Sequence, residues 1–310
     1  MIQLIRPNGN FDFLGKSKPF IVASTLAAIL STIGLFTKGL NFGIDFTGGA
    51  EVQLKAPQGW NIGKVRSELE SGGLKDPVVV QIGATTDREF LIKVQSSPEK
   101  LAAVGSDVKR IIGEKSGSKD FEVVRVDVVG PQAGANLRSA AILSIFYAAL
   151  AILIYITFRF DVRYAPGVVR ALGVDVIITL GIWVLLQKEF NLTVLASLLT
   201  IAGYSCNDTI VIYDRIRDYT KTYPSWGIEQ AVNRSINQNL GRTLLTTICT
   251  LFVVVTLWIM GGPVLQDFAL PLLIGMVISV FSTIFVANPM VVYMEKRRLA
   301  RAKATPAHAK

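Results

Sequence analysis

Long apolar segments, separated by shorter polar stretches, dominate the pattern of this 310-residue chain. Six of them are about 17 to 25 residues long, the length that an α-helix needs to cross roughly 30 Å of hydrocarbon. They are continuously apolar rather than alternating, and lipid offers the backbone no hydrogen-bond partners, so each is predicted to be a transmembrane helix. The segments are Phe20–Thr37, Leu137–Phe158, Ala171–Gln187, Phe190–Tyr213, Thr243–Met260 and Phe268–Tyr293.

The segment Lys38–Asn136, between the first two apolar segments, has the composition of a soluble domain. Short alternating stretches predict strands, and apolar residues at helical spacing predict helices. Their order is strand, helix, strand, strand, helix, strand, which is typical of a ferredoxin-like α+β domain. The six elements are Glu51–Lys55, Ile62–Glu70, Val78–Ile82, Phe90–Val94, Leu101–Ile112 and Phe121–Val129.

Charge then gives the predicted protein an orientation. Lys38–Asn136 holds 13 basic and 13 acidic residues, so the net charge of +9 lies entirely outside this segment. The excess basic residues fall at both termini and on alternate connections between helices, which the positive-inside rule assigns to the cytoplasm. We therefore expect residues 1–19 and the basic tail 294–310 to be cytoplasmic, and the α+β domain to be extracytoplasmic. Binding to nucleic acid loses its main support, and the prediction is a polytopic α-helical membrane protein in contact with membrane lipids.

The sequence gives no pattern for a cofactor, a metal site or a hydrolytic enzyme. With 51% hydrophobic and 18% charged residues, the chain is neither a disordered protein nor a small disulfide scaffold. Its two cysteines, Cys206 and Cys249, fall within predicted helices and have no metal-ligand spacing. No phosphate-binding loop, HExxH motif or Ser/His/Asp set is present. We expect a non-enzymatic membrane protein.

Charged residues inside predicted helices are the candidate functional groups. Asp175 lies in the third helix, Asp208 in the fourth, and Arg242 opens the fifth. A carboxylate at membrane depth costs at least roughly 2.5–3.5 kcal/mol, so it rarely lacks a partner or a purpose. An aspartate that alternately gains and loses an arginine partner would bind and release protons. A static Asp208–Arg242 pair between two helices, or for Asp175 a polar contact between helices, are the structural alternatives.

At these positions the chain resembles the SecD/SecF family of translocon accessory proteins. Phe42–Gly49 looks like the family's FGxDFxGG signature, and Gly203–Arg217 is similar to GYSxNDTxVxxDRxR, a fourth-helix signature of the SecF branch. Asn237–Thr247 matches the start of the family's fifth helix. The resemblance covers the whole chain in order, and six helices favour a separate SecF-type subunit over a fused SecDF chain.

The resemblance implies a function that composition does not indicate. SecF pairs with SecD in a twelve-helix unit of the resistance–nodulation–division superfamily, which uses the proton-motive force to assist preprotein export through SecYEG, downstream of SecA. Asp208 would be the proton-binding carboxylate and Arg242 its partner, with Asn207 and Thr246 around them. Asp175 would have a smaller part, since Val174 stands where many relatives have histidine. Sodium remains an alternative coupling ion, because carboxylate, amide and hydroxyl oxygens suit either cation.

The signature residues Asp45, Phe46, Gly48 and Gly49 have two interpretations. Two glycines after an apolar strand permit a tight turn or close backbone packing against the outer ends of helices, so the segment would form a hinge between membrane and external domain. The alternative is direct contact with the exported chain. Two other functions also stay open for the protein: proton-driven efflux of small molecules or lipids on the same superfamily fold, and a non-conducting scaffold of the translocon. We expect a multi-pass protein of the cell inner membrane.

Overall fold

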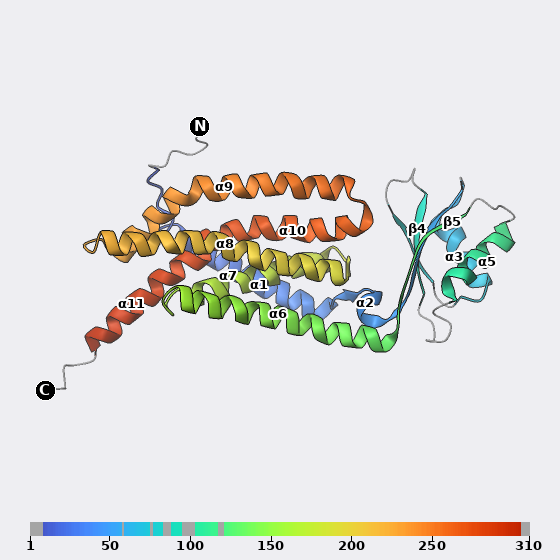
Figure 1. Ribbon diagram of the computed structural model, residues 1–310, viewed down its shortest axis with the longest axis horizontal. Coiled ribbons are helices and arrows are strands. Elements are labelled where there is room, and N and C mark those ends of the chain that lie inside the picture. The colour runs from blue at the N-terminus through green and yellow to red at the C-terminus, as the bar shows by residue number, and fades with distance from the viewer. Residues whose placement is uncertain are drawn as a thin grey trace.

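The computed structural model describes residues 9–57, 59–74, 77–82, 88–94, 103–116 and 121–304. The molecule is elongated, with a long helical bundle and an α+β domain at one end (Figure 1). The C-terminal helix α11 (Asn288–Ala304) lies at the opposite end of the bundle (Figure 1). Two positions of the predicted helix Leu101–Ile112, together with residues 1–8 and 305–310, fall outside the described residues.

Six helices in the described part are long and apolar enough to cross a membrane. In chain order they are α1 (Ser17–Lys38), α6 (Pro131–Arg159), α7 (Ala165–Leu185), α8 (Leu192–Thr222), α9 (Ile228–Met260) and the continuous span of α10 (Gly262–Ser282), the π-helical turn η1 (Thr283–Ala287) and α11. The apolar stretches of α7, α8 and the span that begins with α10 contain the largest shares of buried residues, whereas the apolar stretch of α1 contains none. The centre of the bundle is therefore formed by α7, α8 and α10.

Two of these helices extend well beyond the apolar segments that predicted them. Helix α8 continues to Thr222 rather than ending at Tyr213, and α9 begins at Ile228 rather than at Thr243. An apolar window finds only the part of a helix at membrane depth, whereas backbone hydrogen bonding continues in water as long as the residues favour it. Gly227 is the N-cap of α9. The Tyr223 N–H donates to the Tyr219 carbonyl at 2.9 Å at the end of α8.

The sixth predicted helix contains a π-helical turn just before Pro289. Proline has no backbone N–H, so it leaves a carbonyl one turn earlier without its usual partner. The Asn288 side chain donates from Nδ2 to the Thr283 carbonyl at 2.6 Å, which satisfies one backbone group of the turn. The helix is thus locally widened just before Pro289.

The α+β domain has the predicted order of strands and helices. In chain order its elements are β2 (Gly49–Lys55), α3 (Ile62–Ser71), β3 (Val78–Ile82), β4 (Glu89–Val94), α5 (Val104–Ser116) and β5 (Glu122–Val129). The sheet is antiparallel with strand order β3-β4-β2-β5. Alternation in β2 buries Ala50, Val52 and Leu54 against α3 and α5, which cover the face away from the bundle (Figure 1). The polar face of the sheet is turned to the bundle.

A short segment between α1 and β2 joins the two parts of the molecule. It contains β1 (Asn41–Phe42) and the four-residue helix α2 (Ile44–Thr47). Strand β1 pairs in parallel with β6 (Glu189–Phe190), which lies in the turn between α7 and α8. The Gly43 N–H also donates to the Phe190 carbonyl at 2.9 Å. The start of the domain is therefore anchored beside the start of α8.

Candidate functional site

Asp208 lies within the bundle on α8 and is only 7% exposed. Arg242 on α9 is the cation whose charge acts on it. In the described part of the chain, however, the two side chains form no ion pair of 4 Å or less. The static ion pair considered from the sequence is therefore absent from this conformation.

The residues predicted to act together around Asp208 differ in their exposure to solvent. Asn207, Arg242 and Thr246 are exposed on the surface of the bundle, whereas Asp208 is buried. The Thr246 hydroxyl donates within its own helix, to the carbonyls of Arg242 and Thr243 at 3.0 Å each. Thr246 therefore does not contact the Asp208 carboxylate through a hydrogen bond, and any contribution from it needs a change of rotamer or a bridging water.

Asp175 is fully buried on α7 and contacts α8 directly. Its Oδ2 accepts a hydrogen bond from the Ser205 hydroxyl at 2.6 Å, and its Oδ1 has no hydrogen-bond partner. Ser205 lies one turn before Asp208 on α8. The structure thus contains the polar contact between helices that was the structural alternative for Asp175, and this contact reaches the helix that carries Asp208.

A stripe of hydroxyl groups on α8 was not singled out from the sequence. Ser205, Thr209 and Tyr213 recur every fourth residue, so they share one face of the helix. The Thr209 hydroxyl lies 3.2 Å from that of Thr283, and the Tyr213 hydroxyl donates to the Ala287 carbonyl at 3.1 Å. This stripe fastens α8 to Asp175 and to the π-helical turn. Its four-residue spacing inside the fourth-helix signature was the available signal.

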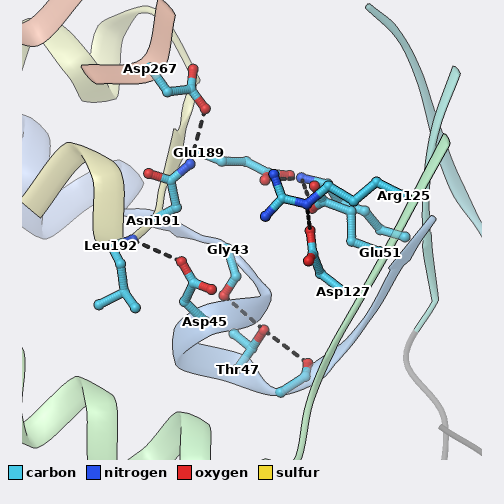
Figure 2. Close-up of polar contacts among 12 residues, drawn as sticks. Gly43, Asp45, Thr47, Glu51, Arg125, Asp127, Glu189, Asn191, Leu192 and Asp267 are labelled. Carbon is cyan, nitrogen blue, oxygen red and sulfur yellow. Dashed lines mark hydrogen bonds and ion pairs between the residues drawn. The ribbon is translucent and has the colours of Figure 1, made fainter. Parts of the chain in front are cut away.

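The first signature segment holds the opposite end of α8. The Asp45 carboxylate accepts a hydrogen bond from the Leu192 N–H at 2.8 Å (Figure 2). Asn191 caps the helix by accepting from the Val194 N–H at 2.9 Å. Phe46 is 5% exposed and stacks on Phe190, with ring centroids 5.5 Å apart. Asp45 and Phe46 therefore fix the segment to the turn from which α8 starts.

Gly48 and Gly49 allow the backbone to pass close to α6. Both have a positive φ, 76° and 143°, a conformation that side chains with a Cβ rarely adopt. A Cβ on Gly48 would lie 2.8 Å from the Pro131 Cα, and a Cβ on Gly134 would lie 2.9 Å from the Gly48 nitrogen. The geometry agrees with the close-packing interpretation of the two glycines.

Charged residues line a cavity of about 300 Å³ between the sheet and the bundle. Lys93 on β4 forms an ion pair with Glu189, and its Nζ also lies 3.4 Å from Glu51 Oε2. Burial raises the pKa of Glu51 above its usual range, although Lys93 acts in the opposite direction. Sequence reasoning missed Lys93 and Glu189, because no spacing relates two residues from such distant segments.

Two further polar contacts border the same cavity. Arg125 and Asp127 form an ion pair within β5 at 2.6 Å, and Asn191 Nδ2 donates to Asp267 Oδ2 at 3.0 Å (Figure 2). Each of these contacts stays within one side of the cavity. No group of three or more histidine, cysteine or acidic residues suited to a metal ion occurs among the described residues.

Comparison with known proteins places these features in a family. Residues 109–297 match the model of the C-terminal region of the SecD/SecF protein export membrane proteins, and residues 33–56 match the SecD/SecF GG motif. The protein translocase subunit SecF of Magnetococcus marinus is 43% identical over 98% of this chain and 100% of its own length.

Two solved structures are also similar to the chain. SecDF from Thermus thermophilus, described as a translocon-associated membrane protein, superposes with a TM-score of 0.84 at 34% identity. SecDF in a super-membrane-facing form superposes with a TM-score of 0.70 at 35% identity. In both cases the match covers 96% of this chain and 40% of the SecDF chain. From its sequence, its six apolar helices and its GG segment, this multi-pass membrane protein belongs to the SecD/SecF family of protein export membrane proteins.

Proposed function

We propose that this protein is the SecF-type subunit of a SecDF complex that assists Sec-dependent export of preproteins. The observation that carries the proposal is the 43% identity to a protein translocase subunit SecF along almost the whole of both chains. The excess of basic residues at both ends of the chain supports cytoplasmic termini in the cell inner membrane and an external α+β domain. Its element order and the strand order β3-β4-β2-β5 support a ferredoxin-like assignment.

The partner in this proposal is a SecD-type chain. The match to SecDF leaves 60% of that longer chain without a counterpart here. Asn207 on α8, and Arg242 and Thr246 on α9, are also exposed polar side chains on the bundle. Polar groups at membrane depth face protein or water rather than lipid, so helices of a second chain are the fitting cover. SecYEG, the SecA pathway and the preprotein follow as functional partners.

The energy source in this proposal is the proton-motive force, coupled at Asp208. A buried carboxylate beside an arginine that is not locked to it can exchange between two partners, a proton and the Arg242 guanidinium. When the proton leaves, the charged carboxylate attracts Arg242 and draws α8 and α9 together. When a proton binds, that attraction is lost. One elementary charge crossing 100 mV supplies roughly 2.3 kcal/mol, enough to bias such a movement.

Complementation tests the export function. The chain is expressed with its SecD-type partner in cells depleted of their own SecD and SecF, and accumulation of an uncleaved preprotein is followed over time. We expect processing to be restored, and the partner to copurify with an affinity tag on this chain. Unchanged preprotein accumulation despite a stable, membrane-inserted complex would contradict the proposal and leave a passive role.

A further inference from the structure

Lys93 lies between two carboxylates that belong to different parts of the molecule. Glu51 is its cross-strand neighbour in the sheet, and Glu189 belongs to the turn between α7 and α8. Figure 2 shows the Glu51 and Glu189 side chains converging from opposite sides of the cavity. All three side chains are partly buried, with exposed fractions of 14% for Lys93, 24% for Glu51 and 28% for Glu189. One cation therefore serves both the sheet and the bundle.

Little else holds the polar face of the sheet to the bundle. The buried apolar residues of the domain form one cluster with α3 and α5, and those of the bundle form separate clusters. Within the described residues, no such cluster contains side chains from both the sheet and the membrane helices. The space between them is the cavity of about 300 Å³ rather than a packed apolar interface. Separating such an interface exposes little apolar surface and therefore costs little free energy.

The domain is tethered to the bundle at one side. The chain enters the sheet through Gly48 and Gly49 into β2, and leaves it from β5 through Gly130 into α6. These crossings lie together, since a Cβ on Gly48 would be 3.3 Å from the Gly130 carbonyl carbon. Strands β2 and β5 are neighbours, whereas Lys93 is on β4, on the other side of β2. Lys93 therefore lies one strand away from the tether, next to Val94, which pairs with Ala50.

We propose that Lys93 is a two-position latch: it holds the α+β domain on the bundle through Glu189 and stays paired with Glu51 when the domain swings away about the glycine tether. The second carboxylate matters energetically, because a partly buried ammonium group without a partner is costly. With Glu51 beside it, Lys93 gives up Glu189 without becoming unpaired. Glu51 thus favours the open arrangement, and Glu189 favours the closed one.

This latch deepens the proposed function, because Glu189 precedes the helix that carries Asp208. The Trp183 indole donates to the Glu189 carbonyl at 3.0 Å, and Asp45 binds the first turn of α8. A displacement of α8 therefore moves the carboxylate that holds Lys93.

Distance measurements between spin labels test the latch. Labels are placed at the exposed positions Lys109 and Leu186, in a background with Cys206→Ala and Cys249→Ala, in the complex reconstituted in nanodiscs. Glu189→Gln is expected to lower the ratio of short to long distances about fivefold, as for loss of one partly buried ion pair. Glu51→Gln is expected to raise the same ratio. Glu122→Gln, the matched control, removes an exposed carboxylate of β5 that does not line the cavity, and leaves the distances unchanged.

A charge exchange keeps the test independent of any one variant. Lys93→Glu alone is expected to lose the short distance, and Lys93→Glu with Glu189→Lys to regain it. Shifts in the same direction for Glu51→Gln and Glu189→Gln, or no shift in either, would overturn the latch. The measurement needs neither a proton gradient nor a preprotein, so its failure leaves the export function standing, and a failure of coupling at Asp208 leaves the latch standing.

Discussion

The carboxylate of Asp45 accepts a hydrogen bond from the backbone N–H of Leu192 at 2.8 Å, although the two residues are 147 positions apart. Asp45 belongs to the glycine-rich signature after α1, and Leu192 is the first residue of α8. The first turn of a helix has unpaired N–H groups and a partial positive charge, both of which favour a carboxylate. The contact thus joins one family signature to the helix that carries the other.

Removing this carboxylate should weaken the start of α8. We expect Asp45→Ala to lower the free energy of unfolding by about 1 kcal/mol, as for the loss of a helix cap. Asp45→Asn keeps an oxygen acceptor and should retain most of the stability. Thermal unfolding of the purified complex measures both. Equal midpoints for Asp45→Ala and the unaltered protein would show that the contact contributes nothing.

A side chain at Gly48 should be tolerated poorly for two separate reasons. Its φ of 76° strains a residue with a Cβ, and the added atom would lie 2.8 Å from the Pro131 Cα. We expect Gly48→Ala to cost about 2–4 kcal/mol in unfolding free energy, from backbone strain together with overpacking. Gly73 is the matched control, because its φ of 95° is also positive but nothing lies within 4 Å of a Cβ there. Gly73→Ala should cost only about 1 kcal/mol. Similar losses in the two variants would mean that close packing at Gly48 is unimportant.

The sequence predicts the helices and strands better than it predicts the contacts between them. Continuous apolar segments gave the six helices, and alternation gave β2 and β4 to within two residues. Asp208 and Arg242 stood out because charge is rare at membrane depth. The pairing of Lys93 with Glu189 and that of Asp45 with Leu192 could not be found, since neither depends on local spacing. The two-residue strands β1 and β6 are too short to produce a periodic pattern.

Two carboxylates outside the membrane should make the stability of the protein depend on pH in opposite directions. Burial raises the pKa of Glu51, so its contribution to stability is present below the unfolded pKa and is lost as pH rises through the folded one. A hydrogen bond from Arg163 lowers the pKa of Asp161, so its contribution is present above the unfolded pKa and is lost as pH falls. Thermal unfolding between about pH 3 and 7 measures both effects. The stability of Glu51→Gln relative to the unaltered protein should increase as pH rises, and that of Asp161→Asn should increase as pH falls. Parallel curves for either variant would contradict the corresponding assignment.

Coupling of export to the proton gradient at Asp208 is the central claim, and export into inverted membrane vesicles tests it most directly. Import of a preprotein is measured with and without a proton gradient, for the unaltered complex, for Asp208→Asn and for Asp218→Asn. Asp218 is an exposed carboxylate on the same helix and serves as the control. We predict that Asp208→Asn loses the stimulation by the gradient, with the ATP-driven part retained, and that Asp218→Asn keeps both. Full stimulation by the gradient in Asp208→Asn would contradict the account.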